Sequence, residues 1–112
     1  MGKAKIKAII KRPDEKYGHM TNISNTLENL QRTVDGYIEA VTYMGTVTTQ
    51  SGSFVVICNE EGKIRNLPFN CWIGGNCFHG TIIVVEAKVD EFTDLTMSMQ
   101  NWKKLIDANN HS

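Results

Sequence analysis

The sequence lacks an excess of charge of either sign, because its 12 basic and 12 acidic residues give a formal net charge of zero. General nucleic-acid binders usually carry a basic excess that neutralises phosphate groups. We therefore expect no general nucleic-acid binding. No apolar run approaches the roughly 20 residues that a membrane-spanning helix needs, so we expect no membrane association either.

Cysteine is also scarce, with Cys58, Cys71 and Cys77 as the three examples. An odd number of cysteines makes a poor disulfide framework. Lysines between positions 3 and 7 interrupt the apolar run that a signal peptide would need. These features predict a cytoplasmic protein with reduced thiols.

No recognisable catalytic or metal-binding motif is present. Cys71, Cys77 and His79 lack the closely spaced cysteine pair typical of zinc sites. A Cys/His nucleophilic pair would need a base within hydrogen-bond reach and an oxyanion hole, and no motif indicates either. Glu60 and Glu61 are neighbours in an expected turn, where both carboxylates would be solvated. The sequence therefore predicts no catalytic residue, no metal and no cofactor.

The length of 112 residues predicts one domain covering 1–112. Residue patterns predict strands at 3–11, 16–23, 37–43, 54–58, 63–67 and 81–85, and helices at 25–34 and 97–109. The resulting order, β-β-α-β-β-β-β-α, predicts an α+β fold with a mostly antiparallel sheet and two helices packed on one face. Residues 109–112 are expected to form a frayed tail.

Local signals refine three of these elements. Asn25 and Glu28 have the spacing of a capping box, and Gly36 is suited to a left-handed helix end. In the C-terminal helix, Trp102 lies on the same face as Leu105 and Ile106. The lysines of the first strand alternate with apolar residues, which predicts that they form its solvated face.

Residues 67–80 are unusually apolar for what we interpret as a loop. The apolar side chains in this segment include Phe69, Cys71, Trp72, Ile73 and Phe78. Such a loop must be buried against the sheet, against a second subunit or around a ligand, because large exposed apolar patches are rare. The second alternative leads us to expect a homo-oligomer.

A weaker pattern points to a small ligand of nucleotide type. Lys63 and Arg65 flank the apolar segment, and strand alternation would place both cations on one face, where they suit an anion. Asn59 and Asn70 offer amide donors and acceptors for a base or ribose. Tyr37 and Trp72 offer rings for stacking. The same residues also occur on ordinary strand surfaces.

Segments distributed over nearly the whole chain resemble a known family. They are IKAII at 6–10, LENLQ at 27–31, GYIEAV at 36–41, VICNEEGK at 56–63, LPFN at 67–70, GTIIVV at 80–85 and EFTDL at 91–95. Together they resemble domain-of-unknown-function family 3846. The turn CNEEGK followed by LPFN is the most specific part of the resemblance.

The resemblance implies a small accessory protein of a phage or mobile element that acts in the host bacterial cytosol. It implies no catalytic residues, but it adds Glu61 and Gly62 to the positions of interest. It also implies a basic residue where this chain has Cys71 and Trp72.

Three classes of function remain open from the sequence. The first is a counter-defence protein that binds and sequesters a small nucleotide-type immune signal. The second is a protein–protein inhibitor or adaptor that docks a host or phage protein. The third is a nuclease or phosphodiesterase that uses Glu60, Glu61 or Asp94 with a metal, which would require carboxylates that converge in space. We favour a non-enzymatic binding protein of the first class.

Overall fold

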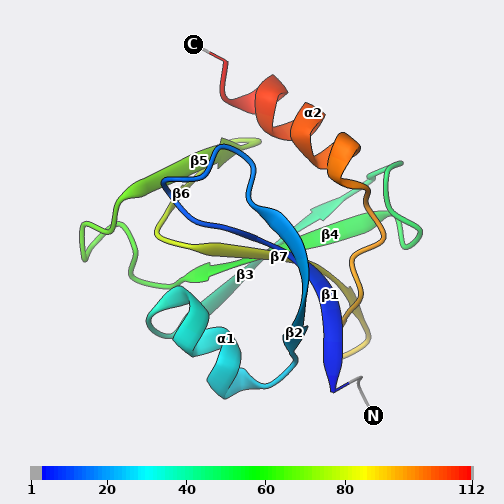
Figure 1. The fold of residues 1–112 in the computed structure, drawn as a ribbon, viewed down its shortest axis with the longest axis horizontal. Coiled ribbons are helices and arrows are strands. Elements are labelled where there is room, and N and C mark those ends of the chain that lie inside the picture. Colours follow the sequence, from blue (N-terminus) through cyan, green and yellow to red (C-terminus); the bar gives the residue numbers. More distant parts are fainter. Residues whose placement is uncertain (1–3, 112) are drawn as a thin grey trace.

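The computed structural model describes residues 4–111 and contains one central sheet, one separate hairpin and two helices (Figure 1). In chain order the elements are β1 (Lys5–Lys11), β2 (His19–Ser24), α1 (Leu27–Val34), β3 (Ile38–Met44), β4 (Ser53–Asn59), β5 (Phe69–Ile73), β6 (Asn76–His79), β7 (Ile82–Lys88), β8 (Glu91–Thr93) and α2 (Met99–Asn109). The predicted α+β class and antiparallel pairing are confirmed.

The central sheet has the order β2-β1-β7-β4-β3, and β8 pairs with the C-terminal end of β7. Every pairing in it is antiparallel. β4 and β7 lie in the middle and are buried on both faces, which explains their continuous runs of β-branched residues. β5 and β6 form a separate two-stranded hairpin.

The two helices cover opposite faces of the sheet, as Figure 1 shows. Leu30 and Val34 of α1 pack on one face with Val55 and Ile83. The other face packs against α2 and the β5–β6 hairpin. The expectation that both helices share one face is wrong. Alternate residues of β4 and β7 point to opposite faces, so each face needs its own cover.

The N-terminal hairpin brings its connecting loop back against β1. Gly18, with φ of 80°, lies so close that an added Cβ would stand 2.3 Å from the Ile10 carbonyl oxygen and 2.7 Å from the Lys11 Cα. A side chain at position 18 would therefore push the loop away from the end of β1. Lys11 is buried in this hairpin, which corrects the expectation that it belongs to the solvated strand face.

Helix α1 begins and ends one residue away from the predicted signals. Thr26, not Asn25, is the N-cap, and its hydroxyl accepts a hydrogen bond from the Asn29 amide at 3.1 Å. Asn25 instead donates to the Phe92 carbonyl at 3.1 Å. Asp35, not Gly36, takes the left-handed conformation that ends the helix, with φ of 63°.

Helix α2 is confirmed, with Trp102 and Ile106 buried in the core. Ser98 is its N-cap. Its C-terminal end is better anchored than the expected frayed tail: Asn109 and Asn110 both form hydrogen bonds to the β5–β6 hairpin. Ser112 lies outside the described residues.

The segment between β4 and β7 differs most from the prediction. Residues 63–67 form consecutive turns, not a strand, in which the Arg65 amide donates to Glu61 and the Leu67 amide to Gly62. The apolar segment 67–80 contains the β5–β6 hairpin instead of an irregular loop. The short strand β8 was not predicted. Within residues 4–111, no helix is both long and apolar enough to cross a membrane.

Candidate functional site

Asn59, expected to bind a ligand, uses its amide to join two parts of the fold. Its Nδ2 donates to the Val34 carbonyl at 3.0 Å and the Asp35 carbonyl at 2.9 Å. Its Oδ1 accepts from the Glu61 amide at 2.7 Å. The side chain is buried and ties the end of β4 to the C-terminus of α1. Asn59 therefore uses its side-chain amide to stabilise the fold and not to contact a ligand.

The cation pair proposed at 63 and 65 is not brought together on a strand face. The Arg65 guanidinium binds the end of α1, with Nη1 donating to the Asp35 carbonyl at 2.7 Å and Nη2 lying 3.4 Å from an Asp35 carboxylate oxygen. This position suits a cation, because the C-terminal carbonyls of a helix carry partial negative charge. Lys63 lines a separate cavity beside β6.

The remaining predicted residues are divided between different surfaces. Tyr37 is 69% exposed, and Glu61 is exposed in the turn after β4. Asn70 and Trp72 line a second cavity, on the α2 side of the hairpin. The residues expected from the sequence to bind one ligand therefore do not form one site, because Asn59 and Asn70 line different cavities.

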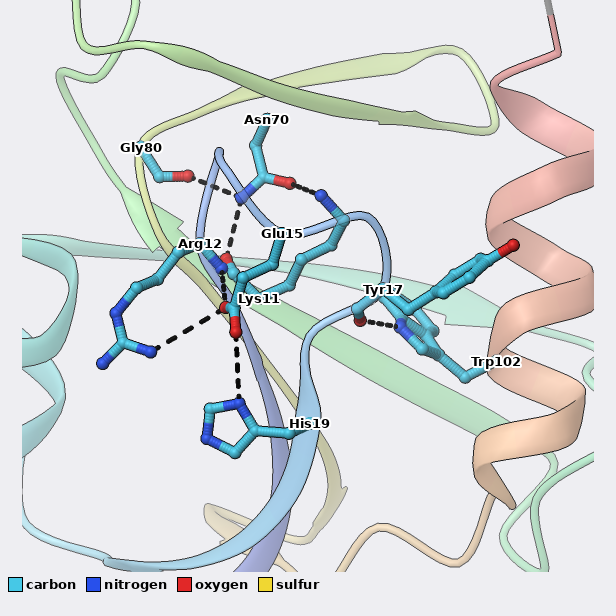
Figure 2. Close-up of polar contacts among 8 residues, drawn as sticks. All are labelled: Lys11, Arg12, Glu15, Tyr17, His19, Asn70, Gly80 and Trp102. Atoms are coloured by element: carbon cyan, nitrogen blue, oxygen red, sulfur yellow. Dashed lines mark hydrogen bonds and ion pairs between the residues drawn. The ribbon is translucent and has the colours of Figure 1, made fainter.

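Asn70 forms the centre of the more promising arrangement (Figure 2). Its Oδ1 accepts from the Lys11 ammonium at 2.6 Å. Its Nδ2 donates to the Lys11 carbonyl at 2.8 Å and to the Gly80 carbonyl at 2.9 Å. One buried amide thus joins β5, the end of β1 and the segment before β7. The two carbonyl partners fix the amide orientation, so its oxygen must face the ammonium.

Lys11 is a buried cation, with 2% of its surface exposed. Burial lowers the pKa of Lys11 below its ordinary value, and the negative charges that Cys71, Glu15 and Asp14 carry when they are ionised offset part of that effect. Among the described residues, Asn70 Oδ1 is the one hydrogen-bond partner of its ammonium, which has three donors. A buried ammonium with a single neutral partner is poorly compensated, so an additional acceptor would stabilise it.

Lys11 contributes to the wall of a cavity of about 530 Å³, which we call the Lys11 pocket. The pocket is lined by Lys11, Pro13, Asp14, Glu15, Lys16, Phe69, Asn70, Cys71, Trp72, Ile106, Asp107, Asn109, Asn110 and His111. Phe69 and Trp72 are each about half exposed, and their ring centroids lie 6.5 Å apart. The volume is in the range of ordinary small-molecule sites.

Two of the three carboxylates in the Lys11 pocket already have partners. Glu15 accepts from the Arg12 amide at 2.8 Å and lies 3.5 Å from His19 Nδ1 (Figure 2). The Arg12 amide is also the main cause of the lowered pKa of Glu15. Asp107 accepts from the Tyr17 hydroxyl at 2.8 Å. Lys11, Lys16 and Asp14 also line the pocket, which therefore contains both cationic and acceptor groups.

The end of α2 holds the aromatic wall of the pocket in position. Asn110 Oδ1 accepts from the Trp72 amide at 2.7 Å, and its Nδ2 donates to the Trp72 carbonyl at 2.9 Å. Asn109 Oδ1 accepts from the Gly74 amide at 2.9 Å. A second tie fixes α2 itself, because Trp102 Nε1 donates to the Tyr17 carbonyl at 2.7 Å. The wall is therefore positioned before any ligand arrives.

The pocket offers recognition chemistry more than reaction chemistry. Cys71 lines it, but burial raises the pKa of this thiol to about 11, which keeps it protonated at neutral pH. No group of three histidine, cysteine or acidic side chains within residues 4–111 is placed to hold a metal ion. The groups available for recognition are two lysine ammonium groups, three asparagine amides, three carboxylates and the rings of Phe69 and Trp72.

Sequence reasoning found Asn70 and Trp72 but missed Lys11. A signal was present, because the alternation of lysine with apolar residues ends at the consecutive pair Ile9 and Ile10. The α2 face of β1 contains Ile9 and Lys11 at its buried end. A lysine that continues an inward-facing row is a candidate for a buried cation.

Comparison with known proteins places the chain in a family. No curated protein and no solved structure matches it. A family described as Domain of unknown function (DUF3846) matches residues 6–107. Because the match covers most of the chain, from the start of β1 to near the end of α2, the protein belongs to this family.

Proposed function

We propose that this protein is a non-enzymatic binding protein that takes a small anionic molecule of nucleotide type into the Lys11 pocket. The observation that carries the proposal is the buried Lys11 ammonium, which has one neutral partner at 2.6 Å and lines a cavity beside two half-exposed rings. An anion in the pocket would supply the ammonium with charged acceptors.

The remaining groups match the other parts of a nucleotide. The Trp72 and Phe69 rings offer faces for a base, and base–aromatic stacking contributes about 1–3 kcal/mol in single-strand binders. Asp14 offers acceptors for an exocyclic amine, and Lys16 adds a second cation at the rim. This proposal keeps the ligand class expected from the sequence but moves its cation from Lys63 and Arg65 to Lys11.

In the cell, the proposed role is counter-defence. A phage or mobile-element accessory protein would sequester a nucleotide-type immune signal in the host bacterial cytosol. Sequestration requires a preformed pocket and no chemical step. The hydrogen bonds that fix Trp72 and Asn70 support this role, because preorganisation reduces the entropic cost of binding.

The alternative is a protein–protein inhibitor or adaptor. Phe69 and Trp72 are exposed on the same hairpin, and aromatic residues are enriched at protein interfaces. In that case the two rings would contact a protein, and Lys11 would serve only to hold the hairpin through Asn70.

Calorimetric titration with a panel of cyclic dinucleotides and ADP-ribose derivatives tests the proposal. We expect micromolar or tighter binding to at least one compound. Lys11→Met should weaken it roughly 10- to 100-fold, since a hydrogen bond to a charged group contributes about 1.5–3 kcal/mol. Lys104→Met is the matched control, because Lys104 is exposed on α2 and lies outside the pocket lining.

Trp72→Ala provides a second test that leaves Lys11 and Asn70 in place. We expect it to weaken binding while the thermal melting transition remains cooperative. Absence of binding across the panel would refute the proposal. Binding that survives Lys11→Met and Trp72→Ala, with both variants folded, would place the ligand elsewhere.

A further inference from the structure

A second cavity, outside the Lys11 pocket, contains a thiol and an imidazole in contact. Cys77 and His79 are two residues apart on β6, so their side chains lie on the same face of the strand. Cys77 Sγ lies 3.3 Å from His79 Nε2. This distance is within hydrogen-bond reach for sulfur, and the pair meets the first requirement for an activated thiol.

The other ring nitrogen of His79 fixes the tautomer. Nδ1 lies 3.0 Å from the Leu67 carbonyl oxygen. A carbonyl oxygen can only accept, so Nδ1 carries the proton when the ring is neutral. Nε2 then presents its lone pair, and the Cys77 thiol is the donor of the contact. The Leu67 carbonyl thus serves as the orienting group behind the base.

Two neighbours hold the imidazole in this orientation. The Phe69 ring meets it edge-on, with centroids 5.7 Å apart and an interplanar angle of 76°. The turn after β4 packs against the backbone of His79 at Gly62. A Cβ at position 62 would lie only 2.7 Å from the His79 carbonyl oxygen, so this approach requires glycine.

The pair is accessible from a cavity of about 300 Å³, which we call the Cys77 pocket. Cys77 and His79 are both partly exposed and line it, together with Asn76 and Lys63. Cys58 also reaches this cavity, but it is buried, and burial raises its pKa to about 11. Cys71 is buried with a similarly raised pKa. Cys77 is therefore distinguished from the other two thiols by both its access and its partner.

We propose that Cys77, with His79 as its base, is a covalent modification site that reacts with small disulfides by thiol–disulfide exchange. His79 Nε2 takes the thiol proton, and the Cys77 sulfur attacks one sulfur of the disulfide. The disulfide bond breaks as the new bond to Cys77 forms. The departing thiolate takes the proton from His79, so one disulfide and one thiol give one mixed disulfide and one thiol.

The test uses 4,4′-dithiodipyridine, a neutral chromogenic disulfide, against the full chain at neutral pH. We expect one fast-reacting thiol per chain, located at Cys77 by peptide mass mapping. It should react faster than the thiol of N-acetylcysteine under the same conditions. Cys58 and Cys71 should react only on unfolding. Cys77→Ser should abolish the fast phase.

His79→Asn tests the role of His79 as a base separately from its hydrogen bond to the Leu67 carbonyl. The shorter asparagine amide can still donate to that carbonyl, but it has no group at the position of Nε2. We expect it to slow the fast phase by about 10-fold or more, since a positioned base contributes about 100-fold or more. The pH dependence of the rate should also differ from that of the wild type, because the group that accepts the thiol proton has been removed. A purely structural His79 would leave this profile unchanged.

With the chromogenic disulfide, either of two results would overturn the proposal. One is a wild-type Cys77 that reacts no faster than N-acetylcysteine. The other is a folded His79→Asn variant with the wild-type rate and pH profile. Incubation of wild-type protein with oxidised glutathione provides a readout that needs no variant: an adduct found on Cys58 or Cys71 and not on Cys77 would also contradict it.

Discussion

Substitution of Asn59 by alanine distinguishes a structural amide from a ligand-binding one. The change removes the Nδ2 bonds to the carbonyls of Val34 and Asp35 and the Oδ1 bond from the Glu61 amide. The Asp35 carbonyl keeps Arg65 as a donor. The Val34 carbonyl, at the end of α1, loses the Asn59 side chain that reaches it from β4.

The expected loss of stability follows from these contacts. Leaving a buried acceptor such as the Val34 carbonyl without a partner costs about 1–3 kcal/mol, and each of the two other bonds contributes about 0.5–1.5 kcal/mol. Because the Asp35 carbonyl and the Glu61 amide have other partners or access to water, we expect a total near the lower end, roughly 2–4 kcal/mol. The total unfolding free energy of a small domain is about 5–15 kcal/mol.

Urea unfolding followed by tryptophan fluorescence measures this loss. The midpoint should fall while the dependence of unfolding free energy on urea stays constant. Asn22→Ala is the control, since Asn22 is exposed on the edge strand β2 and should change stability by no more than about 0.5 kcal/mol. Asn59→Asp should cost more than Asn59→Ala, because it places a carboxylate against two carbonyl oxygens.

An Asn59→Ala variant as stable as Asn22→Ala would refute this reasoning. It would mean that the amide is not needed to join β4 to α1. Asn59 would then be available for the ligand-binding role that the sequence suggested.

Three further expectations concern pH, packing and assembly. Burial raises the pKa of Cys58 and of Cys71 to about 11, so the stability that these protonated thiols contribute is present below about pH 9 and is lost as pH rises towards 11. Urea titrations at increasing pH should show a smaller loss of unfolding free energy in Cys71→Ala than in wild type. An equal loss in both proteins would contradict this. Trp102→Phe should cost about 1–3 kcal/mol of unfolding free energy, because the Tyr17 carbonyl loses the indole donor. Trp72→Ser should shift the mass measured by light scattering from a two-fold dimer towards monomer, and a monomeric wild type would remove the dimer expectation.

Elements that depend on local patterns were predictable from the sequence. The apolar runs of β4 and β7 indicate buried strands because few other structures bury short β-branched runs on both sides. The spacing of Trp102 and Ile106 indicates α2 because a helix places both on one face. Each of these signals comes from one segment and needs no knowledge of a distant partner.

The failed predictions have identifiable physical causes. Alternation suggested a strand at 63–67, but Ile64 is 84% exposed, and the segment satisfies its amides in local turns. Residues 67–80 were interpreted as a loop, although a glycine pair between apolar runs, here Gly74 and Gly75, is also a hairpin signal. Gly74 does adopt a positive φ of 59° at the turn.

The Lys11 pocket depends on contacts that are distant in sequence. Lys11 and Asn70 are 59 residues apart, and Trp102 lies 85 residues from Tyr17. Residue types indicated that Asn70 and Trp72 were suited to binding, but only the sheet topology shows which cation accompanies them. This is why the ligand class could be suggested from the sequence while its cation was placed on the wrong segment.

The position of β7 has a consequence for how the chain is made. Before residue 82 leaves the ribosome, the nascent chain contains only separate two-stranded ribbons, β1 with β2, β3 with β4, and β5 with β6. Isolated two-stranded ribbons are marginally stable in water. β7 then enters between β1 and β4 and joins the β1–β2 and β3–β4 ribbons into one sheet, while β5 and β6 remain a separate hairpin. Folding of the sheet is therefore deferred until most of the chain has been synthesised, and a ribosome that stalls before β7 would present two apolar ribbon faces to the cell's chaperones.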